Sequence, residues 1–369
     1  MHALQFCIAI VAAYFNYRHA RGNRLVFTAL TIWTTLSLSI VAADTFRLLE
    51  WVPAVEWVRA FGVFWFVIAG PLLLARSLWR HAEKSAPVDS GRRMVLRAGA
   101  VLAAAPLTGV AFAIREAHRE PQVRELTMPV FDLHPDLEGL RLVQISDIHL
   151  SPFFSREELR RVIDQANSLS ADLALVTGDL ISSSSDPLDQ AIAELRRLRA
   201  RAGIYGCLGN HEILAGVEAL TATLGRQNGI RFLRSEAEGL HFGKAKLNVA
   251  GVDYQRINRP YLVGAQELLR PDTTNLLLSH SPDVFPVAAK QGWDVTLSGH
   301  THGGQVQFEY VHPKMNPARF STPFVYGQFR QGRSSMFVTS GLGTIGIPAR
   351  LGAKPEIALI RLTAANAKA

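Results

Sequence analysis

The chain has 369 residues, a formal net charge of +8, 48% hydrophobic residues and a mean hydropathy of +0.12. Most of the net positive charge lies before residue 121, where 13 Lys and Arg stand against 7 Asp and Glu. A DNA-binding domain would itself carry the basic excess, so the rest of the chain is not expected to bind nucleic acid. The two cysteines, Cys7 and Cys207, both lie in apolar runs, which argues against a disulfide framework.

The first third of the chain contains three long apolar runs, over residues 25–43, 58–78 and 94–113. Spanning a bilayer takes about 20 apolar residues, so each run is long enough to be a transmembrane helix. A shorter run over residues 1–15 would make a fourth helix. We therefore expect a helical transmembrane region over residues 1–113. Buried core helices are the alternative, but these runs show no polar face.

Basic residues flank these runs unevenly and predict an orientation. Arg18, Arg21 and Arg24 precede the first full-length run, and five Lys and Arg within 76–93 precede the last. By the positive-inside rule these Arg-rich segments face the cytoplasm. The chain after Ala113 is then expected on the extracytoplasmic side of a multi-pass protein of the cell membrane.

The last apolar run resembles a twin-arginine export signal. Arg92 and Arg93 precede a weakly apolar stretch that ends in an A-x-A sequence at residues 111–113, where a signal peptidase would cut. The twin-arginine export machinery is therefore an expected partner. Because the signal is internal, an ordinary last helix with basic anchors remains the alternative. Both interpretations place the following domain outside the cytoplasm.

Strand and helix patterns alternate in the remainder of the chain, which indicates an α/β fold. Residues 114–139 are expected to form a linker and a lead-in strand, and residues 363–369 a tail. Ser155 and Glu158 predict a capping box at a helix start, and further helices are expected over 186–199 and 217–228. Apolar runs predict strands over 140–145, 173–177, 204–208, 246–251, 275–278, 295–297, 336–339 and 357–362.

Five of these strands run directly into side chains that can bind a metal ion. The clusters after them are Asp147 with His149, Asp179, Asn210 with His211 and Glu212, His280, and His300 with His302. Ligands of open α/β sheets bind at the carboxyl ends of strands, so these side chains are expected at one edge. Each of the first four clusters taken alone is compatible with a turn, a helix cap or a buried histidine. The five together point to a metal site.

The last cluster, "SGHTHGGQ", carries the strongest individual signal. Two histidines at i and i+2 can direct both imidazoles at one point when the backbone is extended or tightly turned. The neighbouring Gly299, Gly303 and Gly304 permit positive φ and a close approach of another group, which we expect to be a metal ion.

The order D-x-H, G-D, G-N-H-acid, H and G-H-x-H resembles the calcineurin-like metallophosphoesterases, also called metallo-dependent phosphatases, over residues 140–362. The preceding apolar runs resemble the membrane-anchored bacterial branch of that family. The resemblance implies a sandwich of two β-sheets flanked by helices, preceded here by the transmembrane region. One departure is Glu212, where many relatives have Asp.

The resemblance implies two divalent metal ions. It places Asp147, His149, Asp179 and His302 on the first ion, and Asp179, Asn210, His280 and His300 on the second. A mixed nitrogen and oxygen ligand set without thiolate suits Mn, Fe or Zn. A hydroxide bridging the two ions would attack a phosphate ester. A phosphodiester is the expected substrate, and a phosphomonoester or the pyrophosphate of a nucleotide-linked lipid is the alternative. His211 would stabilise charge or protonate the leaving oxygen, with Glu212 orienting it.

Three features near these motifs have weaker signals. Phe153 and Phe154 are expected to pack in the core, with a lipid-facing lip as the alternative. The segment 341–343 is expected to turn near the site. Arg350 is either a phosphate contact or a solvated arginine.

Alternative functions are a pyrophosphatase acting on UDP-2,3-diacylglucosamine in lipid A synthesis, and a non-catalytic membrane sensor. The first needs a cytoplasmic substrate, which the predicted orientation disfavours. The second would be expected to lack a ligand residue, and none is missing. A zinc protease is disfavoured because the chain has no H-E-x-x-H motif. Location at a membrane favours a lipid or another envelope component as the substrate.

Overall fold

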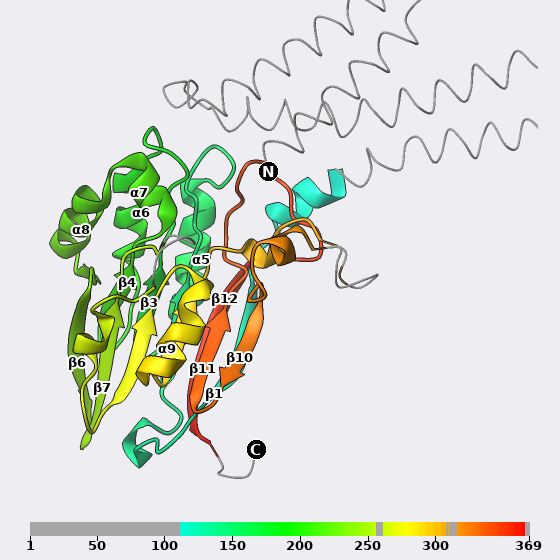
Figure 1. Cartoon of the computed structure of the whole chain (residues 1–369). Helices are drawn as coiled ribbons and strands as arrows, with labels where there is room; N and C mark the ends of the chain where they lie inside the picture. Colours follow the sequence, from blue (N-terminus) through cyan, green and yellow to red (C-terminus); the bar gives the residue numbers. More distant parts are fainter. Residues whose placement is uncertain (1–110, 256–260, 308, 310–315, 366–369) are drawn as a thin grey trace, which may run out of the picture. The chain divides into compact units, whose positions relative to one another are not determined.

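The computed structural model describes residues 111–255, 261–307, 309 and 316–365. In this part the strands form two six-stranded sheets (Figure 1). The first sheet has the spatial order β1 (Gln122–Val130), β12 (Glu356–Ala364), β2 (Arg141–Ile145), β3 (Leu173–Thr177), β4 (Ile204–Cys207) and β5 (Ile230–Phe232). The second has the order β10 (Gly327–Gln331), β11 (Ser334–Val338), β9 (Val295–Ser298), β8 (Thr274–Leu278), β7 (Ala245–Gly251) and β6 (Glu236–Phe242).

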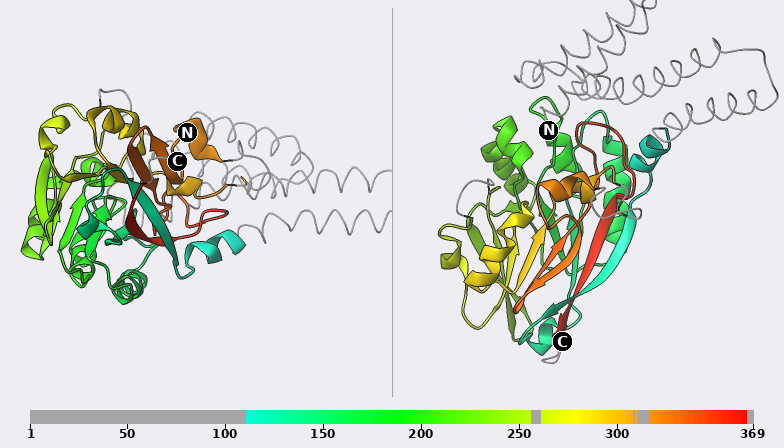
Figure 2. Two further views of the ribbon diagram at one scale, coloured as in Figure 1. Left: turned by 90° about the horizontal axis from the view of Figure 1, so that it is seen from below. Right: turned by 45° about the vertical axis from the view of Figure 1, so that its right-hand side comes forward.

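Helices cover the outer faces of the two sheets (Figures 1 and 2). Residues 111–117 are helical, and the α-helices that follow are α5 (Arg156–Ser168), α6 (Leu188–Leu195), α7 (Asn210–Ala215), α8 (Glu218–Gln227) and α9 (Phe285–Gln291). Short 3-10 turns lie between them: η1 (Pro135–Leu137), η2 (Ala265–Leu268), η3 (Pro282–Val284), η4 (His302–Gly304) and η5 (Pro317–Phe320). The strands and helices thus form four layers, in which the two sheets lie inside and helices lie outside each of them.

Three apolar cores hold these layers together. The middle core lies between the sheets, where residues such as Leu142 and Leu175 of the first sheet pack with Leu276 and Leu297 of the second. A second core joins the outer face of the first sheet to α5 and α6. A third joins the outer face of the second sheet to α9. Because both sheets are covered on both faces, their central strands are continuous apolar runs.

Strand direction determines which residues reach the same edge. In the first sheet β2, β3, β4 and β5 are parallel, and in the second β7, β8, β9 and β11 are parallel. The carboxyl ends of the parallel strands in each sheet therefore lie together. His280, which follows β8 in the second sheet, hydrogen-bonds through Nδ1 to the carbonyl of Thr177, the last residue of β3 in the first. The carboxyl ends of the parallel strands in the two sheets therefore lie next to each other.

The expected α/β fold with two sheets and flanking helices is confirmed, as is the capping box. The side chain of Ser155 accepts from the amide of Glu158, and Glu158 accepts from the amide of Ser155. The helix expected over 186–199 is shorter, because Asp186 instead accepts hydrogen bonds from the amides of Ser182 and Ser183. Five further elements, β5, β6, β10, α7 and α9, were not expected from the sequence.

Within the described residues, no helix has the length and apolar character needed to cross a membrane. The runs predicted to span the bilayer fall within residues 1–113, of which 1–110 lie outside the described part. The same holds for the twin-arginine pair.

Candidate metal centre

The polar clusters after β2, β3, β4, β8 and β9 meet at the carboxyl edge of the two sheets. Backbone hydrogen bonds align neighbouring loops: the amide of Asp147 donates to Gly178, and the amide of His149 donates to Asp179. A further bond joins the two sheets, from the amide of His300 to Oδ1 of Asp147 at 2.9 Å. All seven side chains predicted as metal ligands are thereby placed on adjacent loops.

One group of ligand atoms comes from Asp147, His149 and His302, all buried. The Nε2 atoms of the two imidazoles are 3.1 Å apart, and Nε2 of His302 is 3.5 Å from Oδ1 of Asp147. Oδ2 of Asp179 is 3.6 Å from Nε2 of His149. Carboxylate and imidazole atoms therefore converge within the spacing of ligands around one cation.

A second group comes from Asp179, His280 and His300, and a third, of His149, Asp179 and His211, shares His149 with the first and Asp179 with the second. Oδ2 of Asp179 is 3.0 Å from Nε2 of His280, which in turn is 3.2 Å from Nδ1 of His300. The same carboxylate oxygen thus approaches a histidine of each group. Asp179 is therefore the residue that the two groups share.

Two buried oxygen atoms test whether a cation fits here. Oδ2 of Asp147 and Oδ1 of Asn210 have no hydrogen-bond partner within the described part of the chain. Leaving a buried polar atom unpaired costs about 1–3 kcal/mol, so such atoms call for a partner that the protein itself does not provide. Both belong to residues predicted as ligands, and the surrounding donor set is nitrogen and oxygen. The site fits divalent cations such as Mn, Fe or Zn.

Backbone conformation marks the same residues. Five of the predicted ligands have positive φ values, between 46° and 75°, although none is glycine: Asp147, His149, Asp179, His300 and His302. Such conformations cost roughly 1–3 kcal/mol each and cluster at functional sites, where the surrounding structure enforces them. The fold therefore holds these side chains in place at some cost to stability.

Glycines make room for the two carboxylates. A Cβ atom on Gly299 would overlap the carboxylate of Asp147, and one on Gly209 would overlap that of Asp179. We expected a metal ion to approach the glycines of the last motif. Instead, the groups that approach are protein side chains, including Asn316 against Gly304. The glycines thus serve the ligand residues, because only a residue without Cβ leaves space for a buried carboxylate here.

Burial is the main influence on the protonation of the site. Burial raises the pKa of Asp147 to about 6, opposed by attraction to His280 and assisted by repulsion from the Asp179 carboxylate. Burial also lowers the pKa of both His149 and His300 to about 3, with additional repulsion from His211 and His280, respectively. Neutral imidazoles keep a lone pair for a cation, which is the form that metal binding requires.

Asp179 and His280 form the exception. Burial is the largest single influence and opposes charge on both, but attraction and hydrogen bonding between them, together with other neighbours, outweigh it. The pKa of Asp179 is lowered and the pKa of His280 is raised to about 10. In the absence of a cation this pair is therefore an ion pair. A bound cation would replace the His280 proton as the positive partner of Asp179.

His211 lies beside the ligands and has a fixed ring orientation. Its ring centroid is 4.8 Å from that of His149, and its backbone amide donates to Oδ1 of Asp179 at 2.9 Å. Nδ1 is 2.7 Å from the carbonyl oxygen of Ser182, so Nδ1 carries the proton of the neutral ring. Nε2 is then the nitrogen that remains to exchange a proton with a bound molecule.

Glu212 has a different place from the one expected. Its buried carboxylate accepts hydrogen bonds from the backbone amides of Gly209, Asp179 and Leu180, at 2.7–3.0 Å. It does not orient the His211 ring, because the carbonyl of Ser182 does so. The prediction that Glu212 supports His211 is therefore corrected. Glu212 holds the loops after β3 and β4 together, and thus positions the Asp179 carboxylate.

Arg350 is neither solvated nor facing outward. It is fully buried and donates to the carbonyls of Ser340, Gly343 and Ala353. This anchors the turn over 341–343, where the amide of Gly343 donates to the carbonyl of Asp147. The predicted phosphate contact is thus replaced by a structural role. Phe153 and Phe154 are both buried, as expected for a core pair.

One aromatic residue at this edge was missed. The ring centroid of Tyr254 is 5.3 Å from that of His300 and 6.1 Å from that of His280. The available signal was positional: Tyr254 follows the predicted strand over 246–251, whose carboxyl end lies at the same edge. The sequence pattern of metal ligands does not include Tyr254, because a neutral phenol is a poor ligand.

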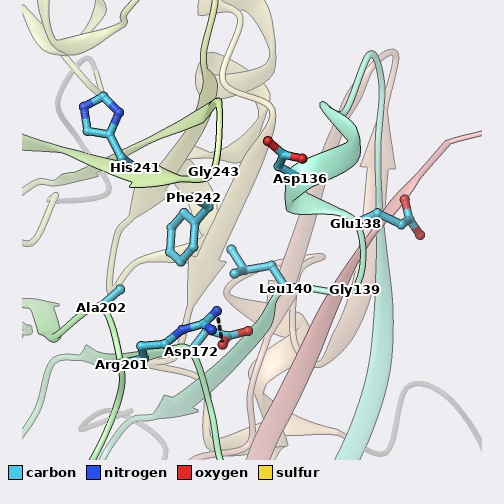
Figure 3. Close-up of a pocket in the computed structure, with 10 residues that line it drawn as sticks. All are labelled: Asp136, Glu138, Gly139, Leu140, Asp172, Arg201, Ala202, His241, Phe242 and Gly243. Carbon is cyan, nitrogen blue, oxygen red and sulfur yellow. Dashed lines mark ion pairs between the residues drawn. The ribbon is translucent and has the colours of Figure 1, made fainter.

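A cavity of about 450 Å³ lies away from these residues (Figure 3). It is lined by residues that precede β2, β3 and β4, such as Leu140, Asp172 and Ala202, so it lies at the opposite, amino edge of the first sheet. Its charged groups have protein partners: Asp172 pairs with Arg201 at 2.8 Å, and Asp136 accepts from the amide of Lys244. This leaves the carboxyl edge as the candidate functional site.

Changing Gly299→Ala tests the space requirement. The added methyl group would displace the Asp147 carboxylate, so we expect divalent-metal affinity to fall at least about 10-fold while the fold is retained. Metal content after dialysis and calorimetric Mn²⁺ titration measure this. Gly239→Ala is the control, because a Cβ there meets nothing within 4 Å. Unchanged metal content in the Gly299 variant would refute the requirement.

Comparisons with known proteins agree with this geometry. The family model described as calcineurin-like phosphoesterase matches residues 140–304. A "transmembrane protein with metallophosphoesterase domain" from Danio rerio is 33% identical over 311 residues, covering 79% of this chain and 67% of that protein. The "uncharacterized metallophosphoesterase YkuE" of Bacillus subtilis is 31% identical over 232 residues, covering 62% of this chain and 81% of that protein. The chain therefore belongs to the calcineurin-like metallophosphoesterases, a family of metal-dependent phosphoester hydrolases.

Proposed function

We propose that the protein is a membrane-anchored phosphodiesterase that uses two divalent metal ions. The observation that carries this proposal is the convergence of two groups of carboxylate and imidazole atoms that share Asp179. The unpartnered oxygens of Asp147 and Asn210 support it, since both are buried where a cation would satisfy them.

We assign Asp147, His149 and His302 to one ion, Asn210, His280 and His300 to the other, and Asp179 to both. The distances support this division, because each imidazole lies closest to the ligand atoms of its own group. His300 and His302 then serve different ions, which accounts for two histidines in one short motif.

When bound, the ions supply an activated water and positive charge beside the phosphoryl oxygens. The protein residues hold the charges and protons around them. Asp179 stays ionised at neutral pH, because its neighbours lower its pKa. His211 keeps Nδ1–H on Ser182, so its protonated ring presents Nε2–H to a phosphoryl or leaving-group oxygen. Glu212 keeps the Asp179 and Gly209 loops at a fixed spacing.

The proposed location is the cell membrane, with the catalytic domain on the extracytoplasmic side. The apolar runs before residue 114 and their Arg-rich flanks support it, as do relatives named transmembrane proteins. Export through the twin-arginine machinery fits the Arg92–Arg93 pair. Action on UDP-2,3-diacylglucosamine is the alternative, and it needs the opposite orientation.

A lipid or other envelope component is the proposed substrate. Two exposed apolar side chains support this, since both lie on segments bound to the His302 loop. Phe320 is 85% exposed in η5, whose N-cap Asn316 donates to the carbonyl of Gly303. Ile345 is 39% exposed, and its amide donates to Gln305. Apolar residues beside a phosphoesterase site suit a substrate with an apolar portion.

Asp179→Asn tests the shared ligand. The amide keeps the shape but removes the negative charge, so we expect hydrolysis of bis-p-nitrophenyl phosphate to fall more than about 100-fold with the fold intact. The assay uses the purified, Mn²⁺- or Zn²⁺-loaded chain, with p-nitrophenyl phosphate in parallel. Cleavage of the diester alone supports a phosphodiesterase. Near-wild-type turnover in the Asp179→Asn variant would refute the role of Asp179 as a ligand shared by both ions. A wild-type protein that is inactive with every metal would favour the non-catalytic membrane sensor.

His211→Ala tests proton transfer separately from metal binding. We expect kcat to fall about 10²- to 10⁴-fold, the usual contribution of a general acid, while metal content stays unchanged. The loss should be smaller for bis-p-nitrophenyl phosphate than for an alkyl diester, because nitrophenolate leaves without protonation. Equal losses on both diesters would assign His211 to charge stabilisation instead.

A reporter fusion after Ile114 tests the orientation. Alkaline phosphatase folds only outside the cytoplasm, so we expect an active enzyme at this position and an inactive cytoplasmic reporter. The same pair of reporters fused near Arg24 should give the opposite result. Activity of the cytoplasmic reporter after Ile114 would overturn the proposed location.

A further inference from the structure

A sixth strand end contributes to the candidate site. β7 is parallel to β8 and adjacent to it, so its carboxyl end lies beside the strand end that carries His280. Val252, Asp253 and Tyr254 follow this end directly. The Tyr254 ring is tilted by 51° against that of His300 and by 62° against that of His280. Tyr254 thus lies beside His280 and His300, although it is not itself a predicted metal ligand.

Contacts from two neighbouring strand ends hold the segment that carries Tyr254. The amide of Val252 donates to the carbonyl of Leu278, at the end of β8. The Asp253 carboxylate accepts hydrogen bonds from Nε and Nη2 of Arg234, which follows β5, at donor–acceptor distances of 2.8–3.1 Å. Such a two-pronged ion pair restrains both partners geometrically. Tyr254 is therefore fixed at the edge of the site before any ligand binds.

The two groups of ligands are flanked by different rings. His211, from α7, lies beside His149, and it is able to exchange a proton through Nε2. Tyr254, from the opposite sheet, lies beside His300. The Tyr254 side chain is half-buried, so part of its surface is accessible to a bound molecule. The face of a phenol ring is apolar and suits the carbon portion of an ester, whereas the polar part of the side chain is confined to its hydroxyl group.

We propose that the Tyr254 ring contacts the ester group that a phosphodiester substrate keeps, while His211 serves the ester group that leaves. This inference rests on the proposed phosphodiesterase function and refines its substrate class. The preferred substrate is a phosphodiester whose retained group is aromatic or otherwise apolar next to phosphorus. Tyr254 is then a determinant of specificity for diesters over inorganic phosphate.

Tyr254→Ala tests this in the full-length, Mn²⁺-loaded protein by calorimetry. We expect binding of diphenyl phosphate to weaken about 3- to 10-fold, the usual range for loss of one aromatic contact. Binding of inorganic phosphate and the Mn²⁺ stoichiometry should not change, because neither involves an ester group. Tyr254→Phe should bind diphenyl phosphate like the wild type, since it retains the ring. Val263→Ala is the control, at a position 80% exposed after the same strand.

Several outcomes would overturn the inference. Equal weakening of phosphate and diphenyl phosphate, or loss of Mn²⁺, would mean that the ring only supports His300. A Tyr254→Phe variant as weak as Tyr254→Ala would transfer the effect to the hydroxyl group. Unchanged diphenyl phosphate binding in Tyr254→Ala, or none in the wild type, would also refute the contact. Because these are binding measurements, a wild type that binds the diester without hydrolysing it would count against the proposed function alone.

Discussion

The hydrogen bond from the His300 amide to the Asp147 carboxylate is the contact on which the site depends. Asp147 follows a strand of the first sheet, and His300 follows a strand of the second. The bond therefore closes the carboxyl edge of the two-sheet sandwich over a buried charge. Gln144 reinforces the junction by donating to the carbonyl of Ser298 across the same gap. Two sheets packed only through apolar side chains would tolerate small shifts that a polar junction does not.

This junction requires an unfavourable local structure. Both buried carboxylates lie against glycines, and five of the seven residues predicted to bind metal take left-handed backbone conformations. Neighbouring elements compensate: Glu212 gathers three backbone amides, and Arg350 ties down the turn that abuts Asp147. Bringing the ligand side chains together thus lowers the stability of the fold. This is the expected pattern at a site that must bind a cation in a fixed geometry.

Much of the fold was predictable because its central strands are buried on both faces. Continuous apolar runs such as 173–177 and 275–278 coincide with strands to within one residue. β6 was missed because it is an edge strand whose exposed residues include charged ones, which hides the apolar pattern. The short helix α7 was interpreted as a loop, since its six residues carry polar site residues instead of an apolar stripe.

By itself, the amino-acid sequence determined the fold class and the list of side chains able to bind metal, because both follow from local order: an apolar strand, then a polar cluster. Tertiary structure decided how these side chains group around Asp179. It also decided that Glu212 accepts hydrogen bonds from backbone amides, that Arg350 is buried and donates to backbone carbonyls, and that Tyr254 lies beside His300. The partners in these contacts lie from 10 to 46 residues apart in the sequence. Hydrogen bonds and ring contacts depend on distances in space that sequence spacing does not encode.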